Sequence, residues 1–135
     1  ESDILSALEY QINFPTSFMF LSHLQRLSIQ TSELVLHARY IIEVCASAIE
    51  FINVRPSAIA SMAILATRIF HQIDSPWTPE LEQYTGYSYS DLIGYVRIVH
   101  SLLLDGEREE SVFMRRKYGS VQFCNVASFP LPSCI

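Results

Sequence analysis

The chain has 135 residues, of which half are hydrophobic and 17% are charged, so it can bury a core as one domain without metal ions or disulfide bonds. This balance excludes a disordered chain and leaves apolar surface for a partner. The net charge of -5 disfavours nucleic-acid binding, because neutralising many phosphates requires an excess of basic residues.

Two short amphipathic helices are predicted at the start of the chain. The first covers residues 2–12, where apolar residues recur at helical spacing: Ile4, Leu5, Leu8 and Ile12. Pro15 separates it from the second helix, which Thr16 caps and which extends to about Leu27. The inward face of the second helix is expected to hold Phe18, Leu21 and Leu24. The chain begins with neither a basic segment nor an apolar run, so we expect no signal peptide.

The longest periodic pattern predicts a helix over residues 32–52. Its inward face is expected to hold Leu34, Ala38, Ile41, Ile42, Cys45, Ala48, Ile49 and Ile52. Its polar face is expected to carry His37, Arg39, Tyr40 and Glu43, with Arg39 and Glu43 one turn apart as a surface pair. Residues 53–55 form a tight turn, so this helix and the next should pack antiparallel or steeply crossed.

The stretch from Pro56 to His71 predicts the central helix of a bundle. Its apolar residues surround the helix on nearly all sides: Ala58, Ile59, Met62, Ala63, Leu65, Ala66, Ile69 and Phe70. Such a helix must be buried on all sides, and Pro56 suits its first position. A membrane span is the competing interpretation, but it needs roughly 20 apolar residues. This run is shorter and contains Arg68, so we expect no membrane association.

Two further helices are marked by their start signals. Thr78, Pro79 and Glu80 provide a capping hydroxyl, a proline at the first position and an acid in the first turn, which predicts a short helix to about Tyr84. After a break at residues 85–87, Ser88 to Asp91 resembles a capping box. The helix that follows carries a stripe of Leu92, Val96, Val99 and Leu103. Residues 107–117 are a charged patch, and residues 119–135 are expected to lie as an extended tail over the bundle.

The sequence contains none of the usual catalytic, cofactor-binding or metal-binding motifs. The four histidines fall one per helix and are interpreted as surface or boundary residues: His23, His37, His71 and His100. Three cysteines lack metal-like spacing and are expected to be reduced thiols of an intracellular protein: Cys45, Cys124 and Cys134. The basic cluster Arg115 to Lys117 lies beside four acids and is interpreted as a solvated helix end. These features favour an all-α interaction module over an enzyme.

Five segments in register resemble the C-terminal cyclin domain of mitotic A/B-type cyclins. They are Leu8-Glu9-Tyr10 with Pro15-Thr16-Ser17-Phe18-Met19-Phe20-Leu21; Ala38-Arg39-Tyr40-Ile41-Ile42-Glu43; Pro56-Ser57-Ala58-Ile59-Ala60; Trp77-Thr78-Pro79-Glu80-Leu81 with Tyr84-Thr85-Gly86-Tyr87; and Arg116-Lys117-Tyr118. The resemblance implies a five-helix cyclin fold with the third helix at its centre. Residues 1–14 would then end a preceding cyclin box and its linker, residues 15–118 would form the C-terminal domain, and residues 119–135 the tail. The signature residues with an implied structural role are Pro56, Ser57, Ile59, Ala60, Trp77, Tyr84, Lys117 and Tyr118.

The resemblance also implies a function. The protein would be a non-enzymatic regulatory subunit of a cyclin-dependent kinase in cell-cycle progression, nuclear and cytoplasmic, with this half buttressing the kinase-binding half. The kinase would be contacted mainly through the N-terminal box, which is absent here, and the truncated chain would tend to self-associate. Two alternatives remain: a nucleic-acid-binding cyclin-like repeat of a transcription factor, and a small helical enzyme.

Some B-type cyclins also resemble one another in a basic pocket that reads phosphorylated partners, built by the first two helices of this domain. Arg39 aligns with one cation of that pocket, whereas Val35 and Ser22 occupy the positions of the others. His23 and His37 are nearby but off register. Arg39 is therefore either a partner-binding residue or a surface partner of Glu43, and the second interpretation is favoured.

Overall fold

The computed structural model describes residues 1–10, 14–28, 31–105 and 109–133. Within them the chain is helical and has no strand, which confirms the predicted all-α class. The helices are α1 (Ser2–Ala7), α2 (Ser17–Ser28), α3 (Ser32–Ser47), α4 (Pro56–Phe70), α5 (Pro79–Thr85), α6 (Tyr89–Leu104) and α7 (Glu109–Tyr118). Three short 3-10 helices are η1 (Ile49–Phe51), η2 (Val121–Phe123) and η3 (Val126–Ser128). Helices α2 to α6 correspond to the five that the resemblance implies.

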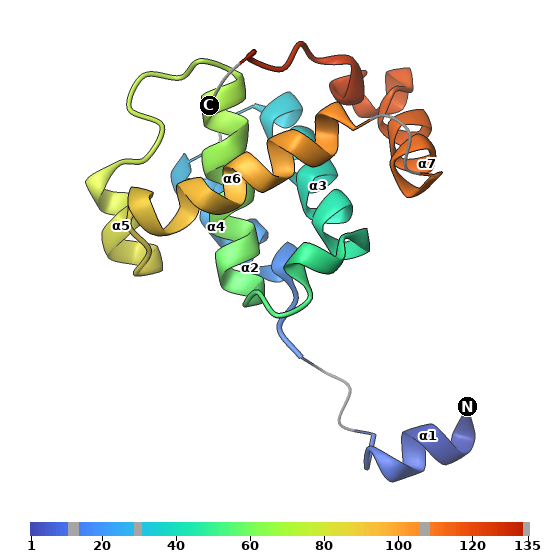
Figure 1. Ribbon diagram of the computed structural model, residues 1–135. Helices are drawn as coiled ribbons and strands as arrows, with labels where there is room; N and C mark the ends of the chain where they lie inside the picture. Colours follow the sequence, from blue (N-terminus) through green and yellow to red (C-terminus); the bar gives the residue numbers. More distant parts are fainter. Residues whose placement is uncertain (11–13, 29–30, 106–108, 134–135) are drawn as a thin grey trace.

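Helix α4 is the centre of the bundle, as the sequence predicts. It packs against α2, α3 and α6, which surround it in Figure 1. Ala60, Ala63 and Ala66 are 0% exposed, because small side chains let the neighbouring helices approach closely. Its one charged side chain, Arg68, donates hydrogen bonds to the carbonyl oxygens of Ser28 (2.7 Å) and Ser75 (3.2 Å). The guanidinium thus ties the end of α2 and the loop after α4 to the central helix.

The predicted start signals of the later helices are present as capping hydrogen bonds. The Thr78 hydroxyl accepts from the Leu81 amide at 3.4 Å, and Gly86 ends α5 in the left-handed conformation with φ 74°. The Ser88 hydroxyl accepts from the Asp91 amide, and the Asp91 carboxylate accepts in return from the Ser88 amide at 2.8 Å. This capping box fixes the start of α6. The predicted stripe of α6 is buried: Leu92, Val96, Val99 and Leu103.

The first helix is shorter than predicted and has no buried residue. Helix α1 ends at Ala7, and the expected position of Ile12 lies outside the described residues. Figure 1 shows α1 away from the bundle, at the N-terminal end of the chain. In α2, Leu21 and Leu24 are buried as expected, but Phe18 is exposed. The apolar residues of α1 therefore have no partner surface in the described part of the chain.

The prediction of one helix over residues 32–52 is wrong at its C-terminal end. Helix α3 ends at Ser47, and Ala48 is extended, with φ -98° and ψ 127°. The Ser47 hydroxyl donates back to the Val44 carbonyl at 2.9 Å, which competes with continued helix formation. The break changes the register, so Phe51 is buried while Ile49 and Ile52, expected inside, are exposed.

The expected polar face of α3 is also partly wrong, because α7 and the tail cover it. His37 and Tyr40 are buried. The His37 Nδ1 lies 2.9 Å from the His71 Nε2, and Phe129 of the tail stacks on His71 with ring centroids 4.0 Å apart. His37 is thus a core residue that packs against His71 and Phe129, and the prediction that it lies at the surface or boundary is wrong.

The basic cluster ends a helix, as predicted, but the tail is not simply extended. The described residues of the charged patch lie in helix α7, and the tail contains η2 and η3 before its last described residues cross the bundle (Figure 1). Cys124 and Asn125 separate these two turns in the left-handed conformation, with φ 53° and 52°. Downstream, the Pro132 carbonyl lies 2.7 Å from the His100 Nε2. Tail contacts with buried groups, rather than a local sequence pattern, therefore set this part of the fold.

The described cysteines are free thiols. Cys45 is buried, and this burial raises the pKa of its thiol to about 12, whereas Cys124 is exposed. Cys134 lies outside the described residues. No helix in the described part of the chain combines the length and apolarity needed to cross a membrane.

Candidate functional site

The predicted site residue Arg39 lines a groove between α2 and α3. The groove has a volume of about 530 Å³ and is lined by Gln25, Arg26, Thr31, Ser32, Val35, Leu36 and Arg39. Arg26 comes from the last turn of α2 and Arg39 from the middle of α3. The structure thus places two arginines, 13 residues apart in the sequence, in the lining of one groove.

The chemistry of this groove suits an anion. Arginine binds carboxylate and phosphate oxygens through several N–H donors in a fixed geometry. The groove also reaches the N-terminus of α3, where Thr31 is the cap residue and its hydroxyl accepts from the Leu34 amide at 3.4 Å. Helix N-termini favour negative charge. Arg26 could not be identified as a site residue from the sequence, because only the packing of α2 on α3 places it in the same groove as Arg39.

The other residues considered for this pocket are divided between the groove, the core and another surface. Val35 lines the groove, as its alignment with a pocket position implies, but its side chain carries no charge. The Ser22 hydroxyl donates to the Phe18 carbonyl at 2.8 Å, within its own helix. His37 is buried against His71, and His23 is exposed on a different groove. The cationic character of the α2–α3 groove therefore comes from Arg26 and Arg39.

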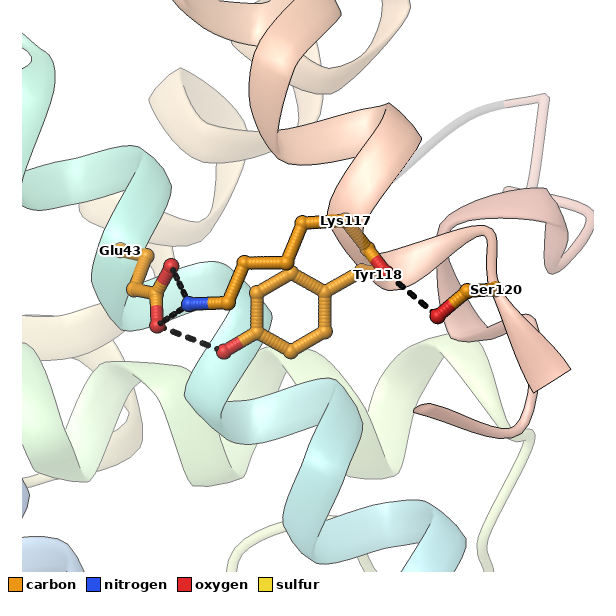
Figure 2. Close-up of polar contacts among 4 residues, drawn as sticks. All are labelled: Glu43, Lys117, Tyr118 and Ser120. Carbon is orange, nitrogen blue, oxygen red and sulfur yellow. Dashed lines mark hydrogen bonds and ion pairs between the residues drawn. The ribbon is translucent and has the colours of Figure 1, made fainter. Parts of the chain in front are cut away.

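The predicted pairing of Arg39 with Glu43 is wrong, because other groups occupy the carboxylate. Figure 2 shows the Lys117 ammonium bridging both oxygens of Glu43, at 2.7 and 2.8 Å. The Tyr118 hydroxyl donates to the same carboxylate at 2.7 Å. No ion pair joins Arg39 to Glu43 in the described part of the chain. In the described ranges Arg39 thus lines the α2–α3 groove without an ion pair to Glu43, and its positive charge also acts on Tyr118.

This contact fixes α7 against α3. Burial, together with the hydrogen bond and the negative charge of Glu43, raises the pKa of Tyr118 above its ordinary value. The Tyr118 ring packs against Tyr40 with centroids 5.1 Å apart, and the Ser120 hydroxyl donates to the Lys117 carbonyl at 2.9 Å. In the basic cluster at the end of α7, the Arg115 guanidinium also binds inside the bundle, at the Leu103 carbonyl. Two of its three basic side chains are therefore engaged in packing.

The remaining signature residues lie around α4 and α5. Pro56 is the first residue of α4, and the Ser57 hydroxyl lies 3.0 Å from the hydroxyl of Tyr87. Ile59 and Ala60 are buried. The Trp77 indole donates to the Tyr87 carbonyl at 2.9 Å, whereas the side chain of Tyr84 is exposed. Through Ser57 and Trp77, the start of α4 and the loop before α5 are both hydrogen-bonded to Tyr87, which lies between α5 and α6.

No group of three or more potential ligands that could hold a metal ion is found in the described ranges. The α2–α3 groove contains no histidine, cysteine or acid among its lining residues there, so it offers no general base or metal ligand.

The sequence model of the family "Cyclin, C-terminal domain" matches residues 15–132. Among similar proteins, Cyclin-A2-4 of Arabidopsis thaliana is 34% identical over 135 residues, which cover 96% of this chain and 29% of that protein. G2/mitotic-specific cyclin-B3 of Gallus gallus is 29% identical over 127 residues, covering 94% of this chain and 31% of that protein. Putative cyclin-A3-1 of Arabidopsis thaliana is 31% identical, covering 97% of this chain and 39% of that protein. The chain therefore spans about three to four tenths of these relatives.

Proposed function

Because the chain belongs to the cyclin C-terminal domain family, we propose that it is the C-terminal half of an A/B-type cyclin that regulates a cyclin-dependent kinase in the cell cycle. The observation that carries this proposal is the family match over residues 15–132, which coincides with the bundle built around α4. Similarity to both A-type and B-type cyclins supports the mitotic class.

The proposed role is regulatory rather than catalytic. In this role the bundle supports a preceding cyclin box, which supplies most of the contact with the kinase. The engagement of Arg115 and Lys117 in contacts within the domain and the net charge of -5 both favour a protein partner over nucleic acid. We further propose that the protein is nuclear and cytoplasmic, which a fluorescent fusion of the longer protein would test by microscopy.

Co-precipitation of a cyclin-dependent kinase with the longer protein that contains this domain tests the proposal. The longer protein should bind the kinase and raise its phosphorylation of histone H1. An Ala60→Arg variant, which places a charge at the centre of α4, should lose both properties because the domain no longer folds. A folded longer protein that leaves the kinase unbound, or that instead binds DNA with a steep salt dependence, would contradict the proposal.

A finer part of the proposal is that the α2–α3 groove binds a phosphorylated segment of a partner protein. Two arginines and the N-terminus of α3 surround one groove, which supports this ligand class. A phosphoserine peptide should bind more tightly than its serine form, and an Arg26→Ala, Arg39→Ala double variant should lose the difference. Arg97→Ala, at an exposed position of α6, is the matched control and should keep it. Equal binding of both peptides to the wild-type chain would refute this part and leave the kinase proposal intact.

A further inference from the structure

A second groove lies between α2, α4 and α5, separate from the groove of the two arginines. Its volume is about 390 Å³, within the range of ligand-binding pockets. It is lined by Phe20, His23, Leu24, Ser57, Ser61, Tyr84 and Thr85. The described lining residues include no aspartate, glutamate, lysine or arginine. The groove therefore suits a neutral, partly apolar group.

The lining residue Ser61 has a hydroxyl without a hydrogen-bond partner in the described part of the chain. The residue is 1% exposed, and its Oγ is among the buried polar atoms that remain unpaired. Buried hydroxyls elsewhere in the bundle bond back to the helix: Ser28 donates to the Leu24 carbonyl and Thr67 to the Ala63 carbonyl, both at 2.8 Å. Since an unpaired buried hydroxyl is unfavourable, Ser61 gains from a polar atom that enters the groove.

The two other aliphatic hydroxyls of the lining, those of Ser57 and Thr85, already have partners, whereas Tyr84 is exposed on the rim. The Ser57 hydroxyl pairs with that of Tyr87 at 3.0 Å. The Thr85 hydroxyl donates to the Leu81 carbonyl at 2.7 Å and accepts from the Tyr87 amide at 3.3 Å. Ser61 is consequently the polar group on α4 that can select an occupant, while Phe20 and Leu24 provide the apolar contact.

We propose that this groove receives a tyrosine side chain from a partner protein. The ring would pack against Phe20 and Leu24, and the phenol would pair with Ser61, because both hydroxyls can donate and accept. A polypeptide fits better than a free small molecule because the exposed apolar surface continues past the groove. Tyr84 on its rim is 61% exposed, and Leu27, on the same face of α2 as Leu24, is 57% exposed.

The test compares two probes that differ in one hydroxyl, N-acetyl-tyrosinamide and N-acetyl-phenylalaninamide, by amide NMR titration of the whole chain. The tyrosine probe should give saturable shifts at the lining residues and bind about tenfold more tightly, the factor that one hydrogen bond contributes. In Ser61→Ala the two affinities should become equal. Equal affinities in the wild type, a preference that survives in Ser61→Ala, or no saturable shift would overturn the proposal. If free phenol binds and N-acetyl-tyrosinamide does not, the proposal is also overturned, because the groove would then accept a small molecule and not a side chain of a polypeptide.

Thermal unfolding provides a measurement that does not depend on a probe. Ser61→Ala removes an unpaired hydroxyl, so its Tm should equal or exceed that of the wild type. Ser28→Ala is the matched control, since it removes a buried hydroxyl that is hydrogen-bonded, and its Tm should fall. A fall in Tm for Ser61→Ala as large as that for Ser28→Ala would show that the Ser61 hydroxyl is satisfied within the fold.

Discussion

The buried pair His37 and His71 should make the stability of the domain sensitive to mild acid. His37 is 1% exposed and is enclosed by the rings of Tyr40, Phe70 and Phe129. Burial and, to a smaller extent, the charge of the neighbouring His71 lower the pKa of its imidazole to about 4. The pKa of His71 is also lowered by burial, although the charge of Glu33 opposes the shift.

The direction of the effect follows from which state binds more protons. The unfolded chain protonates this imidazole near pH 6.5, whereas the folded chain does so near pH 4. Between these values the unfolded state binds more protons than the folded state. The contribution of His37 to the free energy of unfolding is therefore fully present above pH 6.5 and is lost as the pH falls toward 4. Since one pKa unit corresponds to about 1.4 kcal/mol, the free energy of unfolding should decrease by about 3 kcal/mol. This is a large fraction of the roughly 5–15 kcal/mol that stabilises a typical domain.

Urea unfolding followed by circular dichroism at several pH values from 7.5 to 4 measures the loss. His37→Phe keeps an aromatic ring in the cluster but cannot titrate, so its free energy of unfolding should decrease less over this range than that of the wild type. His23→Phe, at an exposed position of α2, is the control and should retain the wild-type pH dependence. If His37→Phe and the wild type lose stability in parallel as the pH falls, buried His37 is not the source of the acid sensitivity and the reasoning is refuted.

Three further substitutions test the packing and the caps by denaturant unfolding. Ala63→Leu should overpack the centre of α4 and cost about 1–3 kcal/mol, because Ala63 has no exposed surface. Glu43→Ala should cost about 1–3 kcal/mol, because it leaves the buried Tyr118 hydroxyl without its acceptor. Ser88→Ala should cost about 0.5–2 kcal/mol, because it removes the hydroxyl that accepts from the Asp91 amide at the start of α6.

Each of these substitutions has a counterpart at an exposed position that should change stability little. They are Ala46→Leu and Glu33→Ala on α3, and Ser101→Ala on α6. An Ala63→Leu variant as stable as Ala46→Leu would contradict the burial of α4. Equal decreases in the free energy of unfolding of the Glu43 and Glu33 variants would show that the contact between α3 and α7 does not stabilise the packing of α7. Likewise, a Ser88 variant no less stable than the Ser101 variant would show that the capping box is dispensable.

The bundle was largely predictable because its signals act over short stretches of sequence. The apolar residues on all sides of α4, the Thr78 cap of α5 and the Ser88 capping box of α6 each depend on neighbours within a few turns. The end of α3 was not predictable from periodicity, because Ile49 and Ile52 continue the apolar pattern past the break at Ala48. Only the packing of Phe51 shows which residue faces the core.

The candidate sites were predictable to a smaller degree. Arg39 stood out through a family resemblance, but its companion Arg26 depends on how α2 lies against α3. The unpaired Ser61 hydroxyl gave no signal in the sequence, since a serine in a buried helix ordinarily bonds to its own backbone.

The sequence by itself determined the helical class, the central position of α4 and the caps, because hydrophobic periodicity and capping are local properties. The tertiary structure alone decided the docking of α7, the burial of His37 and the shape of both grooves. These features depend on contacts between residues far apart in the chain, such as Tyr118 with Glu43, 75 residues away, and His37 with His71, 34 residues away. His37 is a core residue because distant segments cover it and the ring nitrogen of His71 lies within hydrogen-bond distance.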